Sequence, residues 1–413
     1  MNPKFRMFLL LMSLMALAAV AQAGQEVTED GVLHIKNGAE PSKGVETMTF
    51  KESWRVGGED SEDFFGLITQ VIIGEDGKVY LLDTRLSEIP VYSKDGERLT
   101  TLSREGDGPG ETRTPTNLIT MPDGTLGLVQ MFPGKITKID TEGVPMGVFE
   151  AGGSDPTQGG FMLFYDCFSG GGEIIVSGEE IKQNPPTGQI RTNFVASFDN
   201  EGNEKARFLA MEQVMDFTKF SFDEDAMNRV DFRKACSGPD GRVYVAPVRN
   251  AYEIHVFNPD GSLERIIMRD FEHRPRADKD YDAVKNAVEA QLAQLPNATI
   301  KVSRTEPDVG ALQFGPDGNL WVTSSRSGYD QPEGILATYD VFSPDGHFIK
   351  QVAAQVEGNG LEDNLFFTPD GGAVLVTGFT EAVRSLQQGG AGAAASEDEE
   401  EAVPMEVIYL SKG

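Results

Sequence analysis

Beyond its first 23 residues the chain has no apolar run long enough to span a membrane. The one strongly apolar stretch, Met7–Val20, has about 14 residues, whereas a membrane-spanning helix needs ~20. It follows the basic residues Lys4 and Arg6 and ends in Ala21–Ala23, a pattern of small residues typical of a secretory signal peptide. We therefore expect cleavage after Ala23, no membrane insertion, and a mature protein that is periplasmic or secreted.

Basic residues are scarce as well. The chain has 36 lysines and arginines against 65 aspartates and glutamates, a formal net charge of −29. Nucleic acids and anionic membrane surfaces repel a protein this acidic, so neither is expected as a partner. Solubility explains the acidity without a ligand. A metal site would also use acidic residues, but here they are scattered and not at ligand spacing.

Glycine and proline, in contrast, are plentiful, with 46 and 22 residues, which is typical of many short strands joined by turns. One repeat unit has a turn and a strand over Gly74–Asp83, a strand and a turn over Glu88–Gly96, and a third strand over Glu97–Leu102. Asp-Gly between alternating apolar runs is a strong hairpin signal, because hairpin turns need residues with positive φ.

This unit is repeated along the chain. Its first turn occurs six times, at Asp76-Gly77, Asp123-Gly124, Gly171-Gly172, Asp240-Gly241, Asp317-Gly318 and Asp370-Gly371. Its second turn occurs in every unit but the last, at Asp95-Gly96, Glu142-Gly143, Glu201-Gly202, Asp260-Gly261 and Asp345-Gly346. The repeats predict an all-β fold over residues 24–413, a six-bladed β-propeller of four-stranded blades.

The sixth unit is incomplete, since its third strand, Glu406–Leu410, is followed by only three residues. The fourth strand must therefore come from elsewhere in the chain. Thr47–Val56 has an alternating pattern and precedes the first unit, so we expect it to complete the sixth blade. Closing the ring with strands from both ends of the chain removes exposed sheet edges.

Both turns of a four-stranded blade emerge on one face of the disc. The long connections therefore emerge on the opposite face, the elaborated face, at 179–191, 203–235, 268–308, 325–336 and 379–404. Ala277–Leu295 has apolar residues at helical spacing and predicts a helix between blades 4 and 5. The acidic low-complexity stretch Gly389–Glu401 predicts a disordered loop over about 387–403.

Four segments resemble those of bacterial exported six-bladed β-propellers, of the NHL-repeat and TolB-like kind. They are Trp54–Gly58, Thr101–Glu111, Asn319–Val322 and Tyr339–Phe342. The resemblance covers nearly all of the chain after the signal segment. It implies a propeller fold and a location outside the cytoplasm, but no particular activity, because a fold does not specify a function.

Candidate binding residues are placed on the elaborated face, because loops on a rigid scaffold often bind ligands. They are Arg85, Arg104, Glu111, Arg249, Arg326 and Tyr329. Arginine and tyrosine are favoured at interfaces, and a basic cluster in an acidic protein attracts an anionic ligand. The glycines of Arg104–Glu111 also suggest a phosphate cradle, but no helix follows and nearby acids repel an anion. A bent turn closed by an arginine–carboxylate pair is the favoured interpretation of this loop.

Motifs for catalysis are lacking. Of the four histidines only His273 is placed on the elaborated face, so a three-histidine zinc site is not expected. No Gly-x-Ser-x-Gly motif lies on a strand-to-helix turn, which argues against a serine hydrolase. An all-oxygen calcium site in the central channel, as in lactonase-like propellers, stays open, although the sequence identifies no ligand set.

Cys167 and Cys236, the two cysteines, lie five residues before Gly172 and Gly241 and so occupy equivalent positions on the innermost strands of blades 3 and 4. An oxidising compartment permits a disulfide between them. Adjacent inner strands can also hold the two Cα atoms farther apart than the ~7 Å that a disulfide allows. A disulfide and buried free thiols are therefore equal alternatives.

The expected function is that of a non-enzymatic binding or scaffold module. It is expected to be a monomer that receives a protein, peptide or glycan at its elaborated face and the mouth of its channel. The alternative is a calcium-dependent hydrolase or lyase of the lactonase-like type. Calcium ligands at the channel mouth and a pocket beneath the insertion 268–308 would favour that alternative. No other cofactor is expected.

Overall fold

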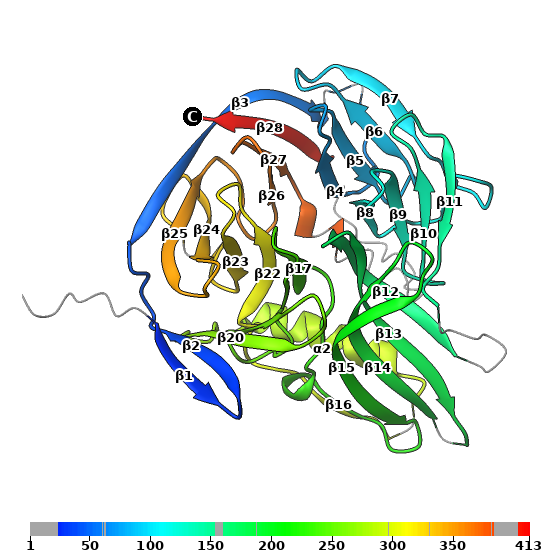
Figure 1. Cartoon of the computed structure of the whole chain (residues 1–413), viewed down its shortest axis with the longest axis vertical. Helices are drawn as coiled ribbons and strands as arrows, with labels where there is room; N and C mark the ends of the chain where they lie inside the picture. The colour runs from blue at the N-terminus through cyan, green and yellow to red at the C-terminus, as the bar shows by residue number, and fades with distance from the viewer. Residues whose placement is uncertain are drawn as a thin grey trace, which may run out of the picture.

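The computed structural model describes residues 24–152, 160–383 and 404–413, apart from positions 60, 62, 187, 296, 330 and 381. Six blades of four antiparallel strands surround a central axis (Figure 1). The prediction of a six-bladed β-propeller is confirmed. The expected signal peptide and the expected acidic loop both lie outside the described residues.

Blades 1 to 3 are each built from four consecutive strands, with the first strand innermost. Blade 1 contains β4 (Ile68–Ile73), β5 (Val79–Asp83), β6 (Ile89–Tyr92) and β7 (Arg98–Leu102). Blade 2 contains β8 (Asn117–Thr120), β9 (Leu126–Gln130), β10 (Lys135–Ile139) and β11 (Pro145–Phe149). Blade 3 contains β12 (Phe161–Gly170), β13 (Glu173–Asn184), β14 (Gly188–Phe198) and β15 (Glu204–Asp216).

Blade 4 is wider than the sequence predicts. Its own strands are β17 (Ala235–Ser237), β18 (Val243–Val245), β19 (Glu253–Phe257) and β20 (Leu263–Arg269). Beyond β20 the sheet continues with β2 (Val32–Asn37) and β1 (Gln25–Glu29). Leu33–Asn37 pairs in parallel with Arg265–Arg269, so residues before the first repeat cover the outer edge of this blade.

Blades 5 and 6 share a strand. Blade 5 contains β22 (Val309–Phe314), β23 (Leu320–Ser324), β24 (Ile335–Phe342) and β25 (Phe348–Gln355), and blade 6 contains β26 (Asn364–Phe367), β27 (Ala373–Val376) and β28 (Glu406–Lys412). β3 (Val45–Gly57) pairs in parallel with β25 through Val45–Thr49 and antiparallel with β28 through Phe50–Gly57. Figure 1 shows β3 running along the rim from one blade to the next. The prediction that Thr47–Val56 completes blade 6 is confirmed, and its pairing with blade 5 is an additional finding.

The repeated turns and the packing between blades explain why the ring forms. Gly77 and Gly96 have φ angles of 78° and 86°, which favour glycine. A Cβ atom on Gly96 would lie 2.6 Å from the Trp54 ring, so this turn of blade 1 packs tightly against blade 6. Apolar residues of neighbouring blades interlock in the same way, for example Val79 with Val374 in one buried cluster. Burial of these faces stabilises the ring.

The long connections carry their own secondary structure. The predicted helix is present as α2 (Asp278–Leu292), between blades 4 and 5. β16 (Ser221–Asp223), in the connection before blade 4, pairs in parallel with β21 (Thr299–Lys301), in the connection after it. The one-turn 3-10 helix η2 (Glu224–Ala226) follows β16. These two connections therefore form one joined structure on the elaborated face. No helix among the described residues is long and apolar enough to cross a membrane.

Candidate functional site

A cavity of about 1410 Å³ occupies the centre of the ring. Its wall is formed by the six innermost strands, β4, β8, β12, β17, β22 and β26. Loops that also line it come from the elaborated face, and they include Arg85, Arg113, Phe132 and Phe379. None of the described Gly-containing turns of the opposite face lines it. The cavity therefore opens toward the face on which the sequence predicts ligand binding.

Most of the cavity wall is apolar. Seven phenylalanines contribute to it: Phe132, Phe168, Phe232, Phe314, Phe366, Phe367 and Phe379. Phe132 is 63% exposed at the rim and meets Phe161 edge-to-face, with ring centroids 5.4 Å apart. An apolar concave wall that also holds a few convergent polar groups is the usual character of a ligand site.

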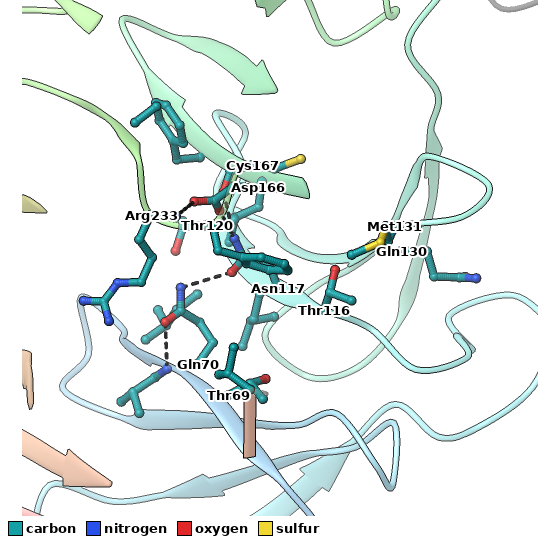
Figure 2. Close-up of a pocket in the computed structure, with 18 of the residues that line it drawn as sticks. Thr69, Gln70, Thr116, Asn117, Thr120, Gln130, Met131, Asp166, Cys167 and Arg233 are labelled. Carbon is teal, nitrogen blue, oxygen red and sulfur yellow. Dashed lines mark hydrogen bonds between the residues drawn. The ribbon is translucent and has the colours of Figure 1, made fainter. Parts of the chain in front are cut away.

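Several polar groups of the cavity belong to one chain of hydrogen bonds that runs across several blades (Figure 2). Gln70 Nε2 of blade 1 donates to Asn117 Oδ1 of blade 2 at 3.0 Å, and Asn117 Nδ2 donates to Asp166 Oδ1 of blade 3 at 2.5 Å. The backbone N–H of Arg233, just before blade 4, donates to Asp166 Oδ2 at 2.8 Å. Arg233 Nη1 donates to Asn364 Oδ1 of blade 6 at 2.9 Å. Four blades and the connection that leads into blade 4 thus contribute to one polar network.

Local backbone features place Asp166 and Arg233 in the cavity. The pairing of β12 with β13 shifts register between Phe164 and Asp166, and bulges of this kind re-aim a side chain. Arg233 has a φ of 58°, which is uncommon for a residue other than glycine. Such strained residues cluster at functional sites. In Figure 2 the Arg233 side chain extends away from the Asp166 carboxylate.

Burial has the largest effect on the pKa values of Asp166 and Arg233. It raises the pKa of the Asp166 carboxyl to about 6, although the backbone N–H and the charge of Arg233 oppose this. Burial also lowers the pKa of the Arg233 guanidinium below its ordinary value. Perturbed groups in a cleft mark a candidate functional site.

The buried Asp166 carboxylate predicts a pH dependence of stability. In the unfolded chain this group ionises near pKa ~3.9, so between pH 4 and 6 the folded state binds its proton more tightly. Stability should therefore rise as the pH falls from 7 to 5, by about 1 kcal/mol from this residue. Urea denaturation at the two pH values should show this gain in the wild-type protein relative to Asp166→Asn, whose side chain does not titrate. The same pH dependence in both proteins would contradict the prediction.

Only one of the predicted binding residues lines the cavity. Arg85 is exposed at its rim and has no ion pair among the described residues. Arg104 and Glu111 form the predicted pair, with Nη2 and Oε1 2.5 Å apart, and Glu111 Oε2 also accepts the Gly108 N–H at 2.8 Å. These contacts close the loop on itself, as expected for a bent turn that is held by an arginine–carboxylate pair.

The other three candidates lie elsewhere. Arg249, predicted to bind a ligand at the elaborated face, is instead buried: its side chain is 7% exposed, because it bonds to Glu224 and to Ser303 inside the joined connections. Arg326 is partly exposed, and its guanidinium donates to the backbone oxygens of Glu272 and His273. Tyr329 lies under Arg274, whose guanidinium carbon is 3.8 Å from the ring centroid. None of these residues contacts the cavity.

The two cysteines also lie at the cavity. Cys167 and Cys236 line the cavity as free thiols. Of the two alternatives, a disulfide and free thiols, the structure therefore contains the second.

The described residues contain no group of three or more histidine, cysteine or acidic side chains that could hold a metal ion. A calcium ion takes ~6–8 oxygen ligands, and the carboxylate oxygens of Asp166 already accept hydrogen bonds. The described cavity residues therefore do not fit the calcium site that the sequence leaves open.

Sequence reasoning missed Asp166, Arg233 and Asn117. A partial signal was present, because Asp166 directly precedes Cys167 on a strand that the repeat predicts to be innermost. The cavity is not the pocket beneath the insertion 268–308 that would favour the calcium-dependent enzyme, since no described residue of that insertion lines it.

No family model matches the chain, and no curated protein matches it either. Among solved structures, it is similar to a Bacteroides fragilis protein named for its inferred export, with 7% identity, 89% of this chain and 99% of the other covered, and a TM-score of 0.49. Virginiamycin B lyase from Staphylococcus aureus has 11% identity, coverage of 88% and 100%, and a TM-score of 0.41. Regucalcin from Agrobacterium tumefaciens, a calcium-binding protein, has 12% identity, coverage of 89% and 97%, and a TM-score of 0.38.

All three are six-bladed propellers, like this chain. At such identities and scores the likeness concerns the fold alone. Membership of a particular propeller family therefore stays a prediction, as do the cellular location and any activity.

Proposed function

We propose that this protein is an exported, monomeric binding module that takes an organic ligand through its elaborated face into the central cavity. The cavity itself is the main support for this function. Its volume of about 1410 Å³ exceeds the ~300–1,000 Å³ of common small-molecule sites. A whole small molecule, or a segment of a peptide or glycan, fits this space.

The polar network favours binding over catalysis. Catalysis by a nucleophile needs an activating base within hydrogen-bond reach, and the described cavity wall offers no such pair. Asp166 is a lone carboxylate on the inner strands, and each of its oxygens already accepts a hydrogen bond. The calcium-dependent hydrolase or lyase is the less supported alternative, because it needs an oxygen cage that these residues do not provide.

A neutral aromatic probe tests whether the cavity binds ligands. We expect 2-naphthylacetamide to bind saturably, with one site per chain, in isothermal titration calorimetry. Gln313 lines the cavity, and its side chain makes no hydrogen bond in the described structure. Gln313→Trp should fill part of the space and weaken binding at least about tenfold, or ~1.4 kcal/mol.

The matched control is Gln291→Trp, the same change at an exposed position of α2. It should leave the affinity unchanged. If the amide does not bind saturably, or if both variants bind as well as the wild-type protein, the cavity is not the binding site.

A further inference from the structure

We infer that the ligand of the central cavity is a small organic acid, with its carboxylate at Arg233 and its apolar or aromatic body against the phenylalanine wall. This inference rests on the proposed binding function and names the class of ligand. Three observations support it: an arginine that lacks a carboxylate partner, an unpaired amide donor beside it, and further basic residues on the same cavity.

Arg233 has most of its hydrogen-bonding capacity unused. A guanidinium carries five N–H donors, and here the side chain makes one hydrogen bond, to Asn364. The Phe366 ring centroid is 5.7 Å from its central carbon, which covers part of the group with an apolar surface. Asp166 is engaged by the backbone N–H of Arg233 and lies outside ion-pair distance of the guanidinium. A planar carboxylate matches the free donors in bidentate geometry.

Arg233 is unusual in this acidic chain. Most described arginines have a carboxylate within 4.0 Å. Among the described residues the exceptions are Arg85, Arg233 and Arg274, and the first two line the cavity. Lys135 lines it too and also has no ion pair with a described residue. Unpaired positive charge is therefore gathered where it attracts an anion, in a protein whose net charge is −29.

One buried polar atom beside Arg233 also lacks a partner. It is Nδ2 of Asn364, whose Oδ1 accepts the hydrogen bond from Arg233. Buried polar groups without a hydrogen bond are costly, and most are paired in folded proteins. Because Arg233 is bonded to Asn364, an oxygen of the acid that reaches the guanidinium also comes near the amide donor.

The apolar wall accounts for the rest of the ligand. Phe232 directly precedes Arg233, and Phe366 and Phe379, which line the cavity, are in edge-to-face contact with centroids 5.6 Å apart. Removing an apolar ring system from water against such a wall is favourable. An inorganic anion would leave this surface uncovered, and a neutral apolar molecule would leave Arg233 without a counter-charge. An acid with an apolar body satisfies both parts.

A pair of nearly isosteric probes separates charge from shape. We expect 2-naphthylacetate to bind the wild-type protein at least about tenfold more tightly than 2-naphthylacetamide at pH 7.5, because hydrogen bonds to charged groups are the stronger ones. Arg233→Gln should weaken binding of the acid to the level of the amide and leave amide binding unchanged. Arg274→Gln is the matched control, since Arg274 also lacks a carboxylate partner but lies outside the cavity. It should change neither affinity.

The outcomes distinguish the inference from the proposed function. If the amide binds and the acid is not preferred, or if Arg233→Gln keeps the preference, the ligand class is wrong while the cavity still binds ligands. If neither probe binds saturably, both proposals fail. Circular dichroism establishes whether Arg233→Gln is folded. If Arg233→Gln is not folded, two other results test the ligand class. They are the preference of the wild-type protein for the acid over the amide and the expected weakening of acid binding in Arg85→Gln.

Discussion

Glu224→Gln is expected to lower the free energy of unfolding by about 3–5 kcal/mol, the usual cost of removing one partner of a buried ion pair. Glu224 lies in η2, and two arginines converge on it. Arg276 donates to both of its carboxylate oxygens at 2.9 and 3.0 Å, and Arg249 Nη2 donates to Oε1 at 2.9 Å. The backbone N–H of Ser303 donates to Oε2 at 2.9 Å.

Both arginines are inside the protein, and the cost arises mainly at Arg249, because Arg276 keeps a second carboxylate partner, Glu306, to which it donates two hydrogen bonds of 3.2 Å. The side chains of Arg249 and Arg276 are 7% and 4% exposed. Burial raises the pKa of the Glu224 carboxyl, but the hydrogen bonds from Arg276 and Ser303 and the charges of both arginines outweigh it, so the pKa lies below its ordinary value. Glutamine has the same shape, one acceptor oxygen and no charge, and its NH2 group would face a guanidinium.

The measurement needs a global and a local probe. Urea denaturation followed by tryptophan fluorescence reports on the blades, since Trp54 and Trp321 lie in β3 and β23. Hydrogen exchange of β16 and β21 reports on the joined connections. Glu272→Gln is the control: its carboxylate is 89% exposed and 3.4 Å from Arg326, and such surface pairs contribute ~0–1 kcal/mol. Unchanged stability and unchanged exchange in Glu224→Gln would contradict the prediction.

Local turn chemistry explains why the blades could be counted from the sequence. Asp76-Gly77 and its equivalents are short-range signals, and the chain folds at each of them as the pattern predicts. The strand β2 gives no such signal. Its position depends on pairing of Leu33 with Arg265, which are distant in sequence and related by no repeat. The same holds for Val45 beside Gln351, which the alternating pattern of β3 could not indicate.

The candidate site was predictable to a smaller degree. The spacing of the turns placed the variable loops on one face, and the cavity opens there. The binding residues did not follow from residue type, because exposure depends on what surrounds a loop. Arg249 and Arg85 look equivalent in sequence, yet Glu224 buries the first and the second remains exposed. Asp166 reaches the cavity through a register shift that alternation does not predict.

Asp340→Asn is the second substitution for which we expect a loss of about 3–5 kcal/mol. Asp340 of β24 is 2% exposed and accepts three hydrogen bonds. Tyr252 Oη donates to Oδ2 at 2.8 Å, Gln351 Nε2 donates to Oδ1 at 2.8 Å, and Arg269 Nη1 donates to Oδ2. Arg269 also donates to the backbone oxygen of Ala39 at 3.0 Å. One carboxylate thus joins blade 4, blade 5 and the segment between β2 and β3.

Burial raises the pKa of the Asp340 carboxyl, against the effect of Arg269 and the two neutral donors, so the ion pair is costly to form and more costly to break. Asparagine has one acceptor oxygen for three donors and leaves the largely buried Arg269 without a counter-charge. Tyr252→Phe removes one neutral donor and should cost only about 1 kcal/mol. Asp345→Asn, at a carboxylate that is 82% exposed, should have almost no effect. Urea denaturation should therefore show the largest loss of stability for Asp340→Asn, a smaller loss for Tyr252→Phe and almost none for Asp345→Asn. Similar stabilities for Asp340→Asn and Tyr252→Phe would show that the charge of Asp340 does not hold blade 4, blade 5 and the segment between β2 and β3 together.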